Sequence, residues 1–184
     1  QLADVCARLV ALANERGADA EIIAMLRRVV RRRHRRRAAI EFIKRQHAAG
    51  KPFFTWMNFT RMHIFTHVRP EYRGKSGMPG NEYADGMWEM DQNVGKILKA
   101  VDDAGITDNT IVVFTTDNGP NFFSWPDAAN TPFRSEKDSN WEGAFRVPAM
   151  VPWPGRIKPG EISNGLMSGL DWFPTLLAAG GDTT

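Results

Sequence analysis

The pattern that most constrains the fold is a long amphipathic segment followed closely by a short β-branched run. Residues 82–104 carry apolar side chains at helical spacing, and Gly105 is a typical helix stop. The apolar face of this predicted helix consists of Met87, Met90, Val94, Ile97, Leu98 and Val101. Residues 111–116, Ile-Val-Val-Phe-Thr-Thr, are typical of a central parallel strand. A helix, a short turn and a buried strand form half of a βαβ unit, so the chain is predicted to be an α/β protein.

Four further segments fit this fold class. Residues 38–49 and 170–179 have apolar residues at helical spacing and predict two more helices. Residues 53–59, an apolar run rich in aromatic side chains, predict a short buried strand. Residues 147–153 predict another short strand, and the two prolines within it favour an edge or a bend.

The N-terminal part differs from the rest of the chain in charge. Residues 1–50 have a net charge of +7 and residues 51–184 a net charge of −4. The total of +3 therefore combines a basic N-terminal segment with an acidic domain. Residues 27–37 contain eight arginines. We predict helices at residues 2–13 and 19–30, and we interpret residues 1–37 as a helical basic extension of a domain that spans residues 38–184.

The arginine-rich segment, Arg27 to Arg37, has three interpretations: a nucleic-acid-binding arm, a solvated charged face, or sequence read in a shifted frame. Binding to nucleic acid is disfavoured because no aromatic residues that could stack on bases lie between the arginines. Cys6 is the only cysteine, so no disulfide can form within the chain. No apolar run approaches the roughly 18 residues of a membrane span.

Polar residues with possible chemical roles follow the predicted strands. Asp117 and Asn118 come directly after residues 111–116 and offer the hard oxygen ligands that calcium or magnesium prefers. His63 and His67 follow residues 53–59, where an imidazole could hold an anion or protonate a leaving group. Lys137 lies in a loop and could bind sulfate or phosphate as a point charge. Each of these residues, considered alone, is also compatible with an ordinary polar turn or loop.

The order of these motifs is more specific than any one of them. Thr60-Arg61-Met62-His63 is followed by a predicted helix and by Thr-Thr-Asp-Asn-Gly-Pro at 115–120. After these come Lys-x4-Glu-Gly-x2-Arg-Val-Pro-Ala-x2-Pro-Trp-Pro-Gly from Lys137 and Asp-Trp-Phe-Pro-Thr-Leu-Leu at 171–177. This series resembles the sulfatase family, and bacterial arylsulfatases in particular, from about residue 38 to residue 182.

The resemblance implies part of an alkaline-phosphatase-like domain, with a mixed β-sheet flanked by helices. Members of this family hydrolyse sulfate esters with a formylglycine and one divalent cation, usually calcium. Matching motifs imply that Asp117 and Asn118 are calcium ligands, that His63 contacts the sulfate and protonates the leaving alcohol, and that Lys137 grips a sulfate oxygen. No role transfers to His67. The resemblance further implies that Glu142, Gly143 and Arg146 shape the loop that follows Lys137.

The chain departs from the family pattern at two points. Ala144 replaces a glycine, which would strain the backbone if the φ angle there were positive. The motif that yields formylglycine, Cys-x-Pro-x-Arg or Cys-x-Ala-x-Arg, has no match, because Cys6 is followed by arginine at the wrong offset. We therefore expect the chain to be a fragment that is inactive in isolation. The resemblance to the family also implies that the intact parent is periplasmic or secreted, although the N-terminus of this chain lacks the pattern of a signal peptide.

The sequence is also compatible with two other functions. The chain could be a remnant that binds sulfate or other anions through Lys137 and His63 without catalysis. It could also derive from a phosphodiesterase or phosphonate hydrolase of the same superfamily. The Thr-Arg-Met-His segment and the sequence around Lys137 favour a sulfatase, and hence a small-molecule sulfate ester as the substrate.

Overall fold

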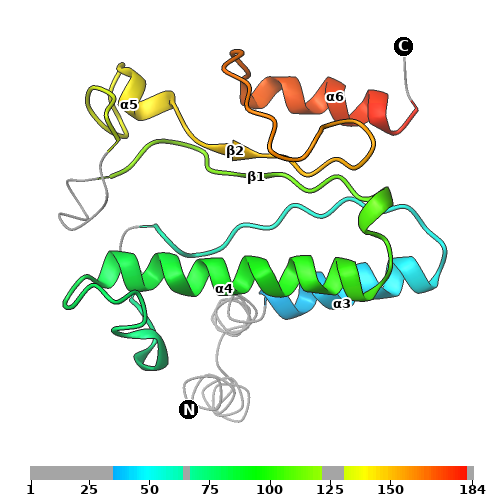
Figure 1. The fold of residues 1–184 in the computed structure, drawn as a ribbon, viewed down its shortest axis with the longest axis horizontal. Coiled ribbons are helices and arrows are strands. Elements are labelled where there is room, and N and C mark those ends of the chain that lie inside the picture. Colours follow the sequence, from blue (N-terminus) through cyan, green and yellow to red (C-terminus); the bar gives the residue numbers. More distant parts are fainter. Residues whose placement is uncertain (1–34, 64–66, 122–130, 182–184) are drawn as a thin grey trace, which may run out of the picture. The chain divides into compact units, whose positions relative to one another are not determined.

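The computed structural model describes residues 35–63, 67–121 and 131–181 (Figure 1). The chain divides into two compact units, residues 1–106 and 107–184. The helices predicted at residues 2–13 and 19–30, and most of the arginine-rich segment, lie outside the described residues. The domain boundary predicted after residue 37 stays a prediction.

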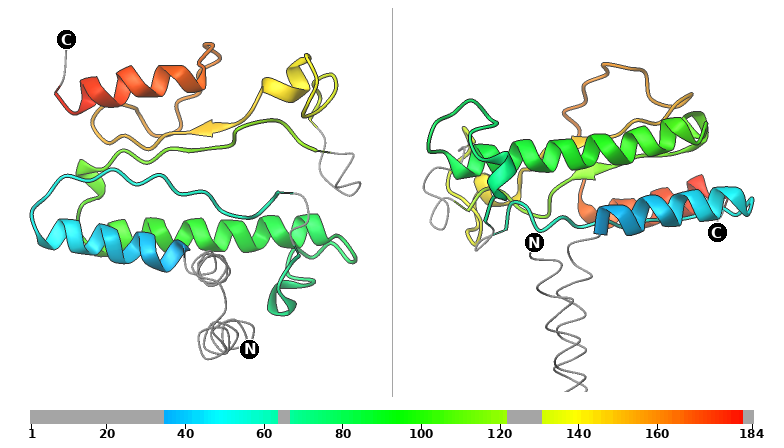
Figure 2. Two further views of the ribbon diagram at one scale, coloured as in Figure 1. Left: turned by 180° about the vertical axis from the view of Figure 1, so that it is seen from behind. Right: turned by 90° about the horizontal axis from the view of Figure 1, so that it is seen from below.

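The first unit is built on two helices, α3 (Arg35–Ala48) and α4 (Glu82–Asp103). They confirm the helices predicted at residues 38–49 and 82–104, and they pack side by side (Figure 1). A short 3₁₀ helix, η1 (Pro70–Tyr72), belongs to a loop that folds over the N-terminal end of α4 (Figure 2). Among the described residues of this unit, the buried apolar side chains are Ala39, Ile43, Val68, Ala100 and Val101.

Both ends of α4 are capped by its own sequence. At the N-terminus, the Asn81 side chain accepts a hydrogen bond from the backbone N–H of Ala84 at 2.7 Å. At the C-terminus, Gly105 has a φ of 68° and donates to the carbonyl of Asp102 at 2.9 Å. Ile106 donates to the carbonyl of Val101 at 3.3 Å, which completes a Schellman motif. Gly105 is therefore the helix stop that the sequence predicts.

The buried face of α4 is polar over its first three turns. Asp85, Glu89 and Asn93, spaced four residues apart, are all buried. Met87 and Leu98, two members of the predicted apolar face, are 39% and 37% exposed. The polar residues of α4 can be buried because they find charged or backbone partners in other segments of the unit.

The strand predicted at residues 53–59 is not formed. The segment has no regular secondary structure, and it pairs with no strand in the part of the chain that the structure describes. Phe54 and Trp56 are 64% and 80% exposed, so the segment is not buried either. Phe53 packs edge-on against Phe42 of α3, with ring centroids 6.3 Å apart. An apolar run becomes a strand only where a neighbour supplies the hydrogen-bond ladder.

The second unit contains a two-stranded antiparallel sheet of β1 (Phe114–Thr115) and β2 (Ala149–Met150). Phe114 lies opposite Met150, and Thr115 opposite Ala149. The predicted parallel strand at 111–116 is therefore shorter and antiparallel, whereas the strand predicted within 147–153 is confirmed in part as β2. Two prolines flank β2 and cannot donate to the ladder, which limits its length. The described residues thus form a helix-rich α/β fragment with a small antiparallel sheet.

The remaining elements of the second unit are short. They are η2 (Thr107–Asn109), α5 (Glu142–Phe145), η3 (Gly169–Asp171) and α6 (Trp172–Ala179). The last two confirm the helix predicted at residues 170–179. A capping box between Ser168 and Asp171 starts this helical segment. Within the described ranges, no helix combines the length and apolar character that membrane crossing requires.

Asp85 ties the loop before α4 to the helix itself. Its carboxylate accepts hydrogen bonds from the backbone N–H groups of Ser76 and Gly74, at 2.9 and 2.6 Å. These backbone donors, Ser76 first, favour the charged carboxylate and hold the pKa of Asp85 below its usual range. A carboxyl group with a lowered folded-state pKa stabilises the fold above its unfolded-state pKa and loses that contribution as the pH falls through the folded-state pKa.

We therefore expect the free energy of unfolding to fall below about pH 4, where carboxyl groups of the unfolded chain begin to take up protons. Asp85→Asn should be less stable than the wild type at neutral pH and should lose less stability on acidification. Urea denaturation at a series of pH values measures both effects. Asp91→Asn removes the same charge from an exposed position on α4 and serves as the control. An Asp85→Asn acid profile as steep as that of the wild type would contradict the prediction.

Candidate functional site

The Asp-Asn-Gly-Pro segment leaves the end of β1 with its polar side chains accessible. Asp117 is exposed, and its Oδ1 accepts a long hydrogen bond, 3.3 Å, from the Thr116 hydroxyl. Asn118 is half-buried and its Nδ2 donates to the carbonyl of Gly119 at 2.8 Å. That bond uses the donor end of the amide and orients the side chain, so the Oδ1 atom is the end of Asn118 that could accept a cation.

Gly119 is buried against α5, where no larger residue would fit. Its backbone N–H donates to the carbonyl of Ala144 at 2.8 Å. A Cβ atom at position 119 would lie 1.7 Å from the carbonyl oxygen of Gly143, closer than any two unbonded atoms can approach. The glycine of the Asp-Asn-Gly-Pro turn therefore allows the backbone at residue 119 to pack closely against the backbone of α5.

A second close contact joins α5 to the loop that carries Lys137. Gly143 donates its N–H to the carbonyl of Arg134 at 2.8 Å, and a Cβ at position 143 would lie 1.9 Å from the carbonyl oxygen of Ser135. The backbone N–H of Lys137 donates to the carbonyl of Pro120 at 2.9 Å. The structure thus brings three predicted site residues, Asp117, Asn118 and Lys137, into one cluster of loops in the second unit.

The backbone around Lys137 is held in an unusual conformation. Ser135 and Asp138 have φ angles of 65° and 67°, in the left-handed region that side chains other than glycine seldom occupy. Such conformations cost about 1–3 kcal/mol each and persist where the surroundings fix them. The Ser139 hydroxyl, which donates to the carbonyl of Glu136 at 2.7 Å, is one such constraint. Lys137 is half-buried within this tight loop.

Ala144, which replaces a glycine of the family pattern, is accommodated without backbone strain. It lies in α5, is buried, and does not have a positive φ angle. The strain considered from the sequence is therefore not present. Two arginines of the same region stack on aromatic rings: Arg134 over Trp141, with 3.6 Å from Cζ to the ring centroid, and Arg146 over Phe133, at 4.2 Å. These stacks fit the loop-shaping role expected of Arg146.

His63 and His67 belong to the first unit, and both are exposed. The backbone N–H of His63 donates to the carbonyl of Thr60 at 3.2 Å, so His63 closes a turn that starts at Thr60.

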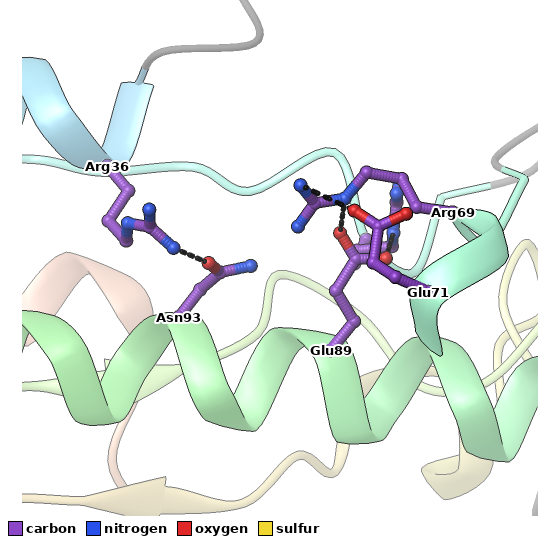
Figure 3. A network of polar contacts seen from close by, with 6 residues as sticks. Arg36, Arg69, Glu71, Glu89 and Asn93 are labelled. Atoms are coloured by element: carbon purple, nitrogen blue, oxygen red, sulfur yellow. Dashed lines mark hydrogen bonds and ion pairs between the residues drawn. The ribbon is translucent and has the colours of Figure 1, made fainter. Parts of the chain in front are cut away.

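Sequence reasoning missed a network of polar contacts on the buried face of α4 (Figure 3). Glu89 of α4 accepts hydrogen bonds from the Nε atoms of Arg61, at 2.9 Å, and Arg69, at 2.7 Å. One turn further along α4, Asn93 accepts a hydrogen bond from Arg36 of α3. The spacing of Asp85, Glu89 and Asn93 was the available signal: three polar residues at i, i+4 and i+8 share one face of a helix.

Arg69 shows the effect of this network on a charged side chain. Burial alone would lower the pKa of Arg69, and the hydrogen bond and negative charge of Glu89 outweigh burial and raise that pKa. Arg69 also pairs with Glu71 at 3.3 Å and lies over the Tyr72 ring, 4.6 Å from its centroid. Its position is therefore fixed from several sides.

The oxygen atoms of Asp117 and Asn118 suit a hard cation by type but are few in number. Calcium takes about six to eight oxygen ligands, and two side chains supply only part of that set. Among the described residues, no group of three or more His, Cys, Asp or Glu side chains could hold a metal. Water, substrate and further residues would have to complete the coordination.

Comparison with known proteins identifies the family that this chain matches. The sequence model of the family described as Sulfatase matches residues 36–181. The N-acetylgalactosamine-6-sulfatase of Canis lupus familiaris is 40% identical over 145 residues, which cover 78% of this chain and 27% of that protein. Human (Homo sapiens) arylsulfatase G is 36% identical over 158 residues, covering 76% of this chain and 28% of that protein.

A solved structure shares the fold. The crystal structure of the PsFucS1 sulfatase from Pseudoalteromonas sp. matches with a TM-score of 0.74 and 34% identity, and the match covers 88% of this chain and 31% of that one. The chain therefore spans about a quarter to a third of the length of the proteins that it resembles.

Substitution of Gly119 tests the close backbone contact of this loop cluster. We expect Gly119→Ala to destabilise the second unit by roughly 1–3 kcal/mol or more, the usual range for overpacking, because the added Cβ would meet backbone that cannot rotate away. Amide hydrogen exchange at Gly119 and Lys137, together with thermal unfolding, measures the loss. Gly169→Ala is the matched control, since nothing lies within 4 Å of the Cβ that it would add. Unchanged protection in Gly119→Ala would contradict the close contact.

Proposed function

Because this chain belongs to the sulfatase family, we propose that it carries part of the active site of a calcium-dependent sulfuric ester hydrolase. Asp117 and Asn118 are the proposed cation ligands, and His63 and Lys137 the proposed sulfate contacts. The observation that carries the proposal is the hydrogen bond from Lys137 N–H to the Pro120 carbonyl, which ties the lysine loop to the Asp-Asn-Gly-Pro segment. Since the chain spans only part of its relatives, the complete activity belongs to this proposal.

Calcium is the proposed cation because the two candidate ligands offer only oxygen atoms, and one of them is a carboxylate. When bound, a divalent cation supplies positive charge that stabilises the sulfuryl oxygens. Asn118 is pre-oriented for this role, because its Nδ2 is already engaged with the carbonyl of Gly119.

Lys137 and His63 supply the remaining chemistry in this proposal. Cleavage of a sulfate ester retains negative charge on the sulfuryl group and develops it on the bridging oxygen. The ammonium group of Lys137 is a compact point charge that can stabilise a sulfuryl oxygen. The imidazolium of His63 can donate a proton to the bridging oxygen as the alcohol leaves.

Binding without turnover is the behaviour that we propose for these 184 residues alone. The covalent step needs a nucleophile, and Cys6 does not have the neighbours from which the family makes formylglycine. This observation also favours a second candidate function, a non-catalytic protein that binds sulfate or a related anion. Release of alcohol from an aryl sulfate by the isolated chain would count against both statements.

Calcium binding is the first test. We expect Asp117→Asn to weaken calcium binding by about tenfold or more, because affinity at such sites depends on the number of charged ligands. Isothermal titration of the whole chain with calcium chloride measures the dissociation constant. Asp108→Asn, an exposed change in the same unit, should leave it unaltered. Equal affinity in the wild type and Asp117→Asn would remove Asp117 from the site.

Sulfate binding is the second test. With calcium present, Lys137→Ala is expected to weaken binding of inorganic sulfate by about tenfold, since a point charge to an anion is lost. Chemical-shift titration of the backbone amides follows the binding, and the exposed Lys158→Ala is the control. An identical sulfate affinity in Lys137→Ala would contradict the role of this lysine. A preference for methylphosphonate over sulfate would favour the phosphodiesterase or phosphonate hydrolase alternative.

A further inference from the structure

The turn that ends at His63 is held by α4 through both of its inner residues. Arg61 donates its Nε–H to Glu89 Oε2 at 2.9 Å, and only 14% of its side chain is exposed. Met62 packs over Gly86, where an added Cβ would lie 3.0 Å from both Sδ and Cε of the methionine. Because His63 closes this turn through its own N–H, the placement of Arg61 and Met62 fixes where the His63 backbone lies.

Glu89 makes a second contact just after His67. Val68 is buried, and Arg69 donates its Nε–H to the second oxygen of Glu89, Oε1, at 2.7 Å. The two oxygens of the Glu89 carboxylate therefore bind two different arginines, Arg61 shortly before His63 and Arg69 shortly after His67. Figure 3 shows Glu89 of α4 pointing toward Arg69. The Glu89 side chain is only 4% exposed, so water competes little for these bonds.

We propose that Glu89 is a positioning residue for His63, acting through Arg61 and Arg69. The inference rests on the proposed function, because His63 matters to catalysis only as a sulfate contact. Reacting groups must be held to within about half an ångström by the residues behind them. A guanidinium donates in a fixed plane, so a carboxylate that holds Nε also fixes the direction of the arginine. Glu89 thus supports the His63 turn without touching substrate.

Replacement of Glu89 by glutamine separates this role from simple packing. Glutamine has nearly the same shape, but it replaces one acceptor oxygen with an NH₂ group, which would face the N–H donor of an arginine. At least one of the two anchors is then lost. Arg61→Lys is a milder second variant, because lysine keeps the positive charge but not the planar donor.

The nitrogen resonances of the histidine rings provide the readout, recorded well below the melting temperature of each variant. Assignment uses His63→Gln, and His47, which lies at the end of α3, is the internal reference. We expect Glu89→Gln and Arg61→Lys to shift or broaden the His63 signals and to leave those of His47 in place. Glu71→Gln is the matched control, because Glu71 also pairs with Arg69 but is exposed and does not contact Arg61. Sulfate binding should weaken by about tenfold in Glu89→Gln, the loss typical when the support behind a ligand is removed.

Several outcomes would overturn the proposal. It fails if Glu89→Gln and Arg61→Lys lower the melting temperature but leave the His63 signals as in the wild type, because the network is then structural only. It also fails if Glu71→Gln moves His63 equally. If Glu89→Gln does not fold, Arg61→Lys decides. If sulfate moves no His63 signal in the wild type, the proposed function fails at His63, whereas the comparison without sulfate still decides the role of Glu89.

Discussion

The first unit depends on the charge that α4 buries. Moving a carboxylate from water into a protein interior costs several kcal/mol unless partners replace the lost hydration. Asp85 and Glu89 meet this demand with different donors, backbone N–H groups for Asp85 and two guanidinium groups for Glu89. Each set of partners comes from a segment without regular structure. The buried carboxylates therefore hold these loop segments against α4.

The second unit depends on a different constraint, the lack of a side chain at two glycines. Gly119 and Gly143 allow three backbone segments to approach within hydrogen-bonding distance: the turn after β1, the start of α5 and the loop around Ser135. Buried backbone carbonyl and N–H groups are costly to leave unpaired, and here they pair with each other. Backbone hydrogen bonds therefore tie together the loops that carry Asp117, Asn118 and Lys137. Asp117 is exposed, and Asn118 and Lys137 are half-buried.

The sequence predicts local structure well and long-range pairing poorly, and the reason is physical. Helix α4 is determined by its own residues, from the Asn81 cap to the Gly105 stop, so periodicity alone identifies it. The runs at 53–59 and 111–116 have strand composition, but strand formation depends on a partner that the run does not encode. The clustering of Asp117 with Lys137 follows from the family resemblance and not from their spacing. Glu89 was missed because a charged residue inside a helical pattern is normally expected to face water.

The loop cluster of the second unit also implies an order of events under the proposed function. Asp117 is a negative charge, and on its own it would repel a sulfate that approaches Lys137. A divalent cation held by Asp117 and Asn118 reverses the sign of that local field. Sulfate should then bind more tightly with the cation present, and by reciprocity the cation should bind more tightly when sulfate is present. The hydrogen bond from the Lys137 N–H to the Pro120 carbonyl matters for this coupling because it keeps the two loops close together. Screening in salt weakens charge interactions beyond about 10 Å. The contact that joins these loops is thus what would allow the two charges to act on one ligand.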